Sequence, residues 1–299
     1  NGDLRFLAPQ GAETESWFKT AGNIHLIANQ VYPATGAVGR ISAGFINANT
    51  WNPDASLTIS RPDGADLPAM PYSAFGHLFV EAAGIENSGI VRAPMGQIRL
   101  GGWGGSNAIT NQVVLTSGSI TSVSAKGLSL PYGGTVDGLE WTYAGEDLSM
   151  PNLIQGSSVA ISASHVDVRE GAVIDLSGGG NLTGAGFVSG RGGSVDPMLH
   201  PLAHLNPGFG FSDGDNRVYA VIPGYAGNFA PVSPDAGAGD PMIGQTITVP
   251  EGVPGLAAGT YTLLPSTFAL QPGAFRVELA AKESADQRGV HSVDGASWM

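Results

Sequence analysis

Apolar and polar residues alternate in short runs along this chain, and each run is followed by a bend and a second short run. In residues 157–180, apolar side chains fall at offsets of 0, 2, 4 and 7 from Val159. A period of two is typical of a β-strand with one buried face, and the step of three marks a corner between strands. The offsets recur at Val159, Ile161, Ala163 and Val166, at Ile24, Leu26, Ala28 and Val31, at Leu78, Val80, Ala82 and Ile85, and at Val113, Leu115, Ser117 and Ile120.

A strand, a corner of fixed length and another strand, repeated along the chain, are the signature of a solenoid. The pattern therefore favours a parallel β-helix, with a β-sandwich as the alternative. In 157–180 we expect Val166 and Val168 to be buried and Asp167 and Arg169 to face outward. Ile161→Asp would then bury an unpaired carboxylate and strongly lower the free energy of unfolding, whereas Asp167→Ala would be nearly neutral.

The composition changes near Pro197, where proline, glycine and aromatic residues become frequent. We therefore expect a β-helical shaft over residues 1–196, with projecting loops at 46–76 and 131–155. Residues 197–299 are expected to form a β-structured region outside the helix that ends in a polar tail.

Composition supports an all-β fold and excludes several partners. The 299 residues include 45 glycines and 20 prolines, which disfavour helices, and only 13% of residues are charged, which disfavours disorder. The net charge is −12 and basic runs are lacking, so a nucleic-acid partner is not expected. No apolar run approaches the ~18 residues that a membrane helix needs, and we expect no membrane insertion. Cysteine is absent, which removes disulfides and thiolate ligands.

Several long segments of the sequence resemble one family of bacterial proteins. Residues 28–37, 121–138, 176–196 and 252–279, the last reading GVPGLAAGTYTLLPSTFALQPGAFRVEL, are similar to the large filamentous haemagglutinin-like exoproteins of Gram-negative bacteria. That family is secreted by the two-partner route, through a dedicated outer-membrane barrel. The resemblance implies a right-handed parallel β-helix, a secreted or cell-surface location, and a role in adhesion, aggregation or contact-dependent competition. It matches the carboxyl-terminal half of such proteins and brings no catalytic motif.

On this basis we expect a structural and adhesive segment, not an enzyme, that binds a host or bacterial surface glycan or protein. The loops 46–76, 131–155 and 197–245 would make the contact. Their aromatic residues, which would otherwise only pack the loops onto the shaft, are Trp51, Trp141, Tyr219, Tyr225 and Phe229. The first strand, Leu4–Leu7, has no cap, and we expect an elongated particle that associates end to end.

Candidate metal and anion sites are weak, and we expect neither a metal nor a cofactor. His200 and His204 have helical spacing, but Pro201 lies between them. Residues 213–216, Asp-Gly-Asp-Asn, lack the glutamate of an EF-hand. The run GGGNLTGAG at 178–186 lacks the aspartate of calcium-binding β-helix repeats, and Gly190–Gly193 lacks the Lys-Ser/Thr of a phosphate loop. Chelators should therefore leave the melting temperature unchanged.

The alternative function is that of a carbohydrate-active β-helix enzyme, such as a polysaccharide lyase or a glycosidase. Such enzymes need paired carboxylates on one face, or carboxylates that hold calcium beside a basic residue. Asp167 and Asp175, with Arg169 nearby, are the candidates, although the alternation puts Asp167 and Arg169 on the outward face, where solvated charges belong. No serine lies in a Gly-x-Ser-x-Gly motif, so the sequence gives no support to serine hydrolysis.

Overall fold

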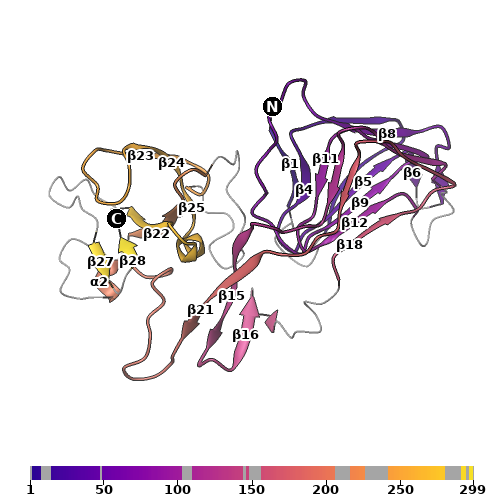
Figure 1. Cartoon of the computed structure of the whole chain (residues 1–299). Helices are drawn as coiled ribbons and strands as arrows, with labels where there is room; N and C mark the ends of the chain where they lie inside the picture. The colour runs from indigo at the N-terminus through magenta and orange to yellow at the C-terminus, as the bar shows by residue number, and fades with distance from the viewer. Residues whose placement is uncertain are drawn as a thin grey trace. The chain divides into compact units, whose positions relative to one another are not determined.

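The structure is a computed structural model of the chain, and it describes residues 2–7, 15–47, 49–102, 110–143, 146–147, 156–205, 216–225, 242–279, 291–293 and 296–298. The fold is all-β with parallel sheets, which confirms the expected fold class at that level (Figure 1). The chain divides into two compact units. Unit 1 contains residues 1–128 and 151–180, and unit 2 contains residues 129–150 and 181–299.

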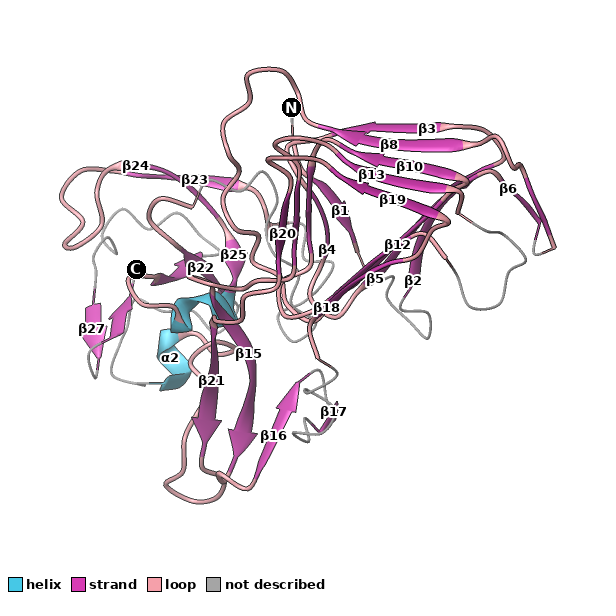
Figure 2. Cartoon of the chain, turned by 45° about the vertical axis from the view of Figure 1, so that its right-hand side comes forward, coloured by secondary structure: helices cyan, strands magenta, loops and turns pink. Residues whose placement is uncertain are grey.

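Unit 1 is built from three parallel sheets of five strands each (Figure 2). In hydrogen-bonded order, sheet A contains β1 (Leu4–Phe6), β4 (Val31–Pro33), β11 (Ile90–Arg92), β14 (Ile120–Ser122) and β20 (Val173–Asp175). Sheet B contains β2 (Glu15–Thr20), β5 (Val38–Ala43), β9 (His77–Glu81), β12 (Gln97–Leu100) and β18 (Ser158–Ile161). Sheet C contains β3 (Ile24–Ile27), β8 (Ser56–Ser60), β10 (Gly84–Asn87), β13 (Gln112–Leu115) and β19 (His165–Val168).

The chain visits these sheets in rotation, from A to B to C and back to A. One passage departs from this order: residues 61–76 follow β8 without a described strand in sheet A, and β4 pairs directly with β11 through Val31 and Val91. The corners before β9 and β12 stack so closely that a Cβ added to Gly96 would clash with the carbonyl oxygen of Gly76, 1.9 Å away. Only a residue without a side chain fits there.

The interior of unit 1 consists of rows of apolar side chains that run across the strands. Leu78, Ile98 and Val159 are in register in sheet B, and the residues two positions later in each strand form the next row. Most of these side chains are buried in one hydrophobic cluster with their counterparts from sheets A and C. Alternation along each strand produces this face, as the sequence pattern predicts.

The recurring offsets mark a step between strands and not one fixed position in the rotation. The copies that begin at Leu78 and Val159 pass from sheet B to sheet C. Those that begin at Ile24 and Val113 pass from sheet C to sheet A. Both corners place an apolar residue at the start of the next strand, so the sequence cannot tell them apart.

The expected burial of Val166 and Val168 is wrong. The two side chains are 43% and 48% exposed. They lie on β19, which is the last strand in the order of sheet C, as β18 and β20 are in sheets B and A. Each side chain is covered by the preceding strand on one side only, so alternation predicts its direction correctly but not its burial.

Residues 46–76 are also more integrated than the predicted loop. β6 (Phe45–Asn47) and β7 (Thr50–Trp51) form a two-stranded hairpin, and β8 is a member of sheet C between β3 and β10. Ser73 and Ala74 are buried, and the hydroxyl of Ser73 donates to the carbonyl oxygen of Pro33. Pro68 and Ala69 contact Arg92 of sheet A, so the projecting part is limited to short stretches around β7 and residues 61–67.

Unit 2 contains three further sheets. The first contains β17 (Glu146–Asp147), β16 (Glu140–Tyr143), β15 (Ser129–Val136) and β21 (Asn181–Phe187). The second contains β25 (Leu264–Pro265), β22 (Arg217–Val221), β26 (Phe275–Leu279), β28 (Ala296–Trp298) and β27 (His291–Val293), and the third pairs β23 (Thr246–Val249) with β24 (Gly259–Thr262). The described residues of the unit also include the short helix α2 (Leu202–Leu205) and the 3-10 helix η2 (Ser266–Leu270).

The division into units differs from the boundary expected at residue 196. Residues 181–196 belong to unit 2 because β21 pairs in parallel with β15, which precedes it by about fifty residues in the chain. Residues 131–143, part of the loop 131–155 expected to project from the shaft, lie in β15 and β16 of that sheet and in the turn between them. The change of composition at Pro197 therefore lies inside unit 2 and does not mark its start.

Candidate functional site

The outward face of sheet B carries a row in which aromatic rings and guanidinium groups alternate. Trp17, Arg40, Phe79 and Arg99 are in register on four neighbouring strands. The guanidinium carbon of Arg40 lies 5.2 Å from the ring centroid of Trp17 and 4.7 Å from that of Phe79, and that of Arg99 lies 5.6 Å from Phe79. Each such contact is worth about 0.5–2 kcal/mol, so the row ties the strands together.

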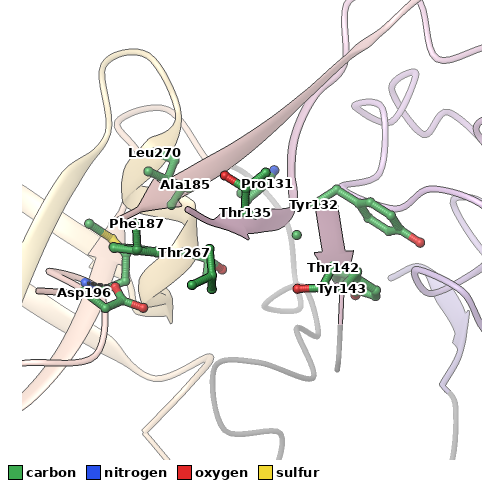
Figure 3. A pocket seen from close by; sticks show the side chains of 14 residues that line it. Pro131, Tyr132, Thr135, Thr142, Tyr143, Ala185, Phe187, Asp196, Thr267 and Leu270 are labelled. Atoms are coloured by element: carbon green, nitrogen blue, oxygen red, sulfur yellow. Dashed lines mark hydrogen bonds between the residues drawn. The ribbon is translucent and has the colours of Figure 1, made fainter. Parts of the chain in front are cut away.

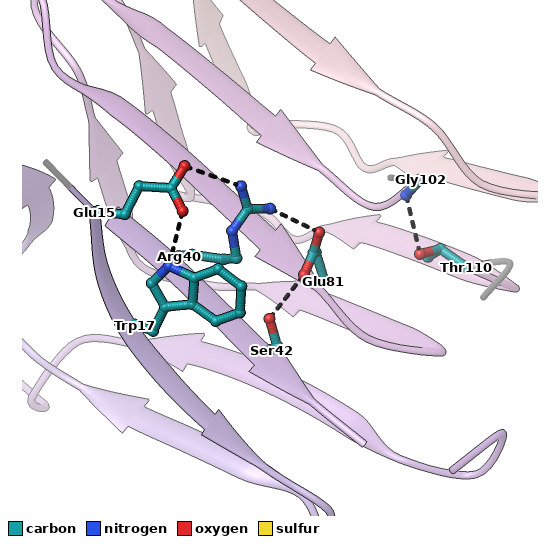
Figure 4. A network of polar contacts seen from close by, with 7 residues as sticks. All are labelled: Glu15, Trp17, Arg40, Ser42, Glu81, Gly102 and Thr110. Carbon is teal, nitrogen blue, oxygen red and sulfur yellow. Dashed lines mark hydrogen bonds and ion pairs between the residues drawn. The ribbon is translucent and has the colours of Figure 1, made fainter. Parts of the chain in front are cut away.

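Two carboxylates hold the central arginine of this row (Figure 4). A guanidinium nitrogen of Arg40 lies 3.1 Å from Glu81 Oε1, and another lies 3.6 Å from Glu15 Oε1. The hydroxyl of Ser42 donates to the other oxygen of Glu81 at 2.7 Å, and the indole nitrogen of Trp17 donates to Glu15 Oε2 at 2.8 Å. Arg40 and Glu81 are buried, whereas the side chain of Glu15 is 40% exposed and can be reached from solvent.

A third cation, Lys19, extends the row along β2. The ammonium of Lys19 lies 4.6 Å from the ring centroids of both Trp17 and Phe45. The ring of Phe45 contacts that of Trp51 edge to face, with centroids 5.4 Å apart. Trp51, expected from the sequence to contact a partner, thus joins the edge of this cluster. We call Glu15, Trp17, Lys19, Arg40, Phe79 and Arg99 the sheet B strip.

His77 borders the strip on β9. Its ring packs edge to face on Phe79 with centroids 6.3 Å apart, and burial lowers the pKa of the imidazole below its usual value. The histidine is therefore neutral at pH 7. It adds an amphipathic ring, and no charge, to this face.

The other two parallel sheets offer no comparable face in their described strands. One outward row of sheet C contains His25, Thr58, Glu86, Val114 and Asp167, and no Phe, Trp or Tyr lies in its described strands. In sheet A the outward side chain of Arg92 is buried beneath residues 61–76. Its guanidinium donates to Gln30 Oε1 at 2.7 Å and to the carbonyl oxygens of Pro68 and Ala69 at 3.1 Å. Accessible aromatic surface therefore concentrates on sheet B.

Unit 2 contains a cavity of about 210 Å³ between β15, β16, β21 and η2 (Figure 3). Its lining is mostly apolar, with the stacked rings of Tyr132 and Tyr143 at 4.0 Å on one side. The hydroxyl of Thr267 lines it and is buried without a hydrogen-bond partner among the described residues, and Asp196 accepts a hydrogen bond from the amide of Met198. Binding sites for small molecules typically enclose about 300–1,000 Å³, so this cavity is small for a ligand.

The remaining aromatic residues expected to contact a partner have mixed positions. Trp141, on β16, donates from its indole nitrogen to the carbonyl oxygen of Tyr132 at 2.9 Å and stays partly exposed. Tyr219 is buried in the hydrophobic cluster of unit 2, which corrects its assignment as a surface residue. Tyr225 is partly exposed in the turn after β22, and Phe229 lies outside the described residues.

The candidate catalytic residues lie on the last strands of sheets C and A. Arg169 donates to Asp167 Oδ2 at 3.1 Å in an exposed pair. Asp175 accepts hydrogen bonds from the hydroxyl and amide of Ser177, and these bonds hold the pKa of its carboxyl below the usual value. Both aspartates are thus engaged by neighbours two positions away, as expected of outward polar residues.

Two of the four candidate metal ligands, His200 and His204, lie within the described residues. The rings of His200 and His204 lie 5.9 Å apart, while Asp213 and Asp215 fall outside the described residues. Within the described ranges, no three His, Cys, Asp or Glu side chains group closely enough to hold a metal ion. In the same part of the chain, no helix is long and apolar enough to cross a membrane.

Trp17, Arg40, Phe79 and Arg99 were not predicted from the sequence as site residues. Within β2, the alternation of Glu15, Trp17 and Lys19 with Ser16 and Phe18 already indicates that the first three side chains share one face. The row itself joins residues spread over 82 positions and becomes visible only with the strand register. No family model, curated protein or solved structure matches this chain.

Proposed function

We propose that this chain is a structural and adhesive segment of a secreted bacterial surface exoprotein. In this proposal unit 1 is one stretch of a right-handed parallel β-helix, and the sheet B strip is a surface that attaches to a glycan or protein on another cell. The parent protein would leave the cell through an outer-membrane secretion barrel. The observation that carries the proposal is the rotation of the chain through three parallel sheets in register.

The connectivity of the strands and the handedness rule for parallel strands support the proposed β-helix. Each strand pairs in parallel with one from a neighbouring passage, and the connection between them runs through the other two sheets except around residues 61–76, where no described strand of sheet A intervenes. Connections between parallel strands of one sheet are right-handed in about 98% of cases, which supports the right-handed form. The resemblance to filamentous haemagglutinin-like exoproteins leads to the same architecture and to a cell-surface location.

Engineered disulfides test the β-helical stacking, since the chain has no cysteine of its own. Thr58 and Glu86 are partners on neighbouring parallel strands of sheet C, and Val114 is the next residue in the row. Adjacent strands lie about 4.8 Å apart, within the Cα distance that a disulfide bridges, and alternate strands lie about 9.6 Å apart, beyond it. We expect Thr58→Cys with Glu86→Cys to form a disulfide. Thr58→Cys with Val114→Cys should stay reduced.

Attachment is tested with beads that carry the purified chain, applied to epithelial cells and to bacterial cells. We expect the coated beads to bind at least one cell type more than beads coated with albumin. If protein-coated beads bind each cell type no better than albumin-coated beads, the adhesive role is refuted, while the disulfide test of strand stacking is unaffected. A loss of chain length in polysaccharides incubated with the protein would instead favour the carbohydrate-active enzyme.

A further inference from the structure

The indole of Trp17 presents accessible aromatic surface on β2, the edge strand of sheet B. Its ring lies against the guanidinium of Arg40, which is buried, yet 50% of the Trp17 side chain remains exposed. Glu15 fixes the orientation of the ring, because its carboxylate accepts the indole N–H at 2.8 Å. Such a ring loses little conformational freedom when a ligand stacks on it, since the protein already orders it.

Polar groups of both hydrogen-bonding types surround this ring. Glu15 is an acceptor that remains 40% exposed, and Lys19 is an exposed donor whose ammonium lies 4.6 Å from the ring centroid. An aromatic face beside a few polar groups is the usual composition of a site for a ligand with one apolar face and polar edges. A sugar ring has that composition, with C–H groups on its face and hydroxyls around its edge.

The local charges decide between neutral and acidic sugars. Around Trp17 the cations Lys19 and Arg40 are matched by the carboxylates Glu15 and Glu81. The chain as a whole carries a net charge of −12. A polyanion would gain no net attraction at the ring and would be repelled by the rest of the protein. An uncharged ligand escapes this penalty.

We propose that Trp17 is a stacking subsite for a sugar ring of an uncharged polysaccharide. Glu15 accepts and Lys19 donates hydrogen bonds to hydroxyl groups of that ring. The proposal rests on the attachment function, because it names the class of ligand that the sheet B strip contacts.

Neighbouring residues 17 and 18 provide a matched pair of variants. Trp17 and Phe18 follow each other on β2 and point to opposite faces, and their side chains are 50% and 51% exposed. The full chain would be titrated with cellohexaose, maltohexaose, chitohexaose and, as the charged comparator, hexagalacturonate. Binding would be followed by calorimetry, and folding of each variant by its melting temperature.

We expect one of the neutral oligosaccharides to bind more tightly than hexagalacturonate. Trp17→Ala should weaken that binding about tenfold, the loss expected when an aromatic stacking contact is removed. Phe18→Ala should leave the affinity unchanged. Three results would overturn the proposal: no binding of any neutral oligosaccharide, tighter binding of hexagalacturonate, or equal losses in the two variants. If beads still attach to cells in any of these cases, only the ligand class is refuted and the adhesive function stands.

Discussion

Two leucines that fit the apolar sequence pattern equally well should differ sharply in their contribution to stability. Leu115 lies on β13 between Asn87 and Val168 in one interior row of sheet C, and it is 0% exposed. Leu176 follows β20, the last strand of sheet A, and is 60% exposed. Truncation of each to alanine removes the same atoms, so the comparison isolates burial.

The expected magnitudes follow from the area that each side chain buries. A fully buried leucine gains about 1.5–3 kcal/mol from burial, and truncation adds a cavity term, which brings Leu→Ala to about 2–5 kcal/mol. We expect about 3 kcal/mol for Leu115→Ala. The same reasoning gives about 1 kcal/mol or less for Leu176→Ala, because most of its surface is already in water. The difference of about 2 kcal/mol would separate the urea midpoints by about 1 M.

The assay must report on unit 1 alone, since a chain of two units need not unfold in one step. Pulse-labelling hydrogen exchange with mass spectrometry, across a urea series, resolves peptides from residues 110–128 from those of unit 2. Similar midpoints for the two variants, or a lower midpoint for Leu176→Ala, would refute the assignment of interior and end positions in the sheets.

Further perturbations test the polar contacts. Glu81→Ala should lower the free energy of unfolding by about 3 kcal/mol in the same urea assay, because it removes the nearer of the two carboxylates that pair with buried Arg40. A loss below about 1 kcal/mol, the range of an exposed ion pair, would contradict this. Thr267→Val should raise the free energy of unfolding of unit 2 by about 1 kcal/mol, and with it the melting temperature, since the valine methyl needs no hydrogen-bond partner. A lower melting temperature would mean that the hydroxyl is hydrogen-bonded. Burial raises the pKa of Tyr32 from 10 to about 12, so the unfolded chain loses this proton first and stability should fall as the pH rises from 10 to 12. Tyr32→Phe should remove about 2 kcal/mol of that alkaline loss, measured as urea midpoints at pH 8 and pH 11.5, and an unchanged loss would refute the shift. Addition of EDTA should leave the melting temperature unchanged, and a shift of several degrees would indicate a metal site.

Alternation within one strand predicted much of the interior, because the direction of a side chain is a local property. Leu78, Val80 and Ile85 are buried as the pattern requires. Burial also depends on whether another strand covers the residue, and the sequence of β19 does not show that it is last in its sheet. Val168 therefore points the expected way and remains half exposed.

The candidate site was less predictable because it depends on register between strands. Trp17 and Phe79 are 62 positions apart, and they approach the same arginine only because β2, β5 and β9 pair in parallel without a shift. The loops that separate these strands differ in length, so no fixed spacing in the sequence marks the row. Trp51, predicted as a contact residue because of its turn-rich loop, adjoins the sheet B strip through Phe45, whereas the aromatic residues within the strands had no such signal.

The pairing of β15 with β21 imposes an order of events on the folding chain. The segment that forms β15 and β16 emerges from the ribosome before β18, β19 and β20, whereas its parallel partner β21 emerges after them. The mixed sheet of unit 2 thus has to wait until the last strands of all three parallel sheets have been made. During that interval the edge of β15 that β21 will cover has no partner from its own sheet, and residues 129–143 form an open sheet edge in the nascent chain. A pause in synthesis between residues 143 and 181 would lengthen the interval in which another chain could occupy that edge.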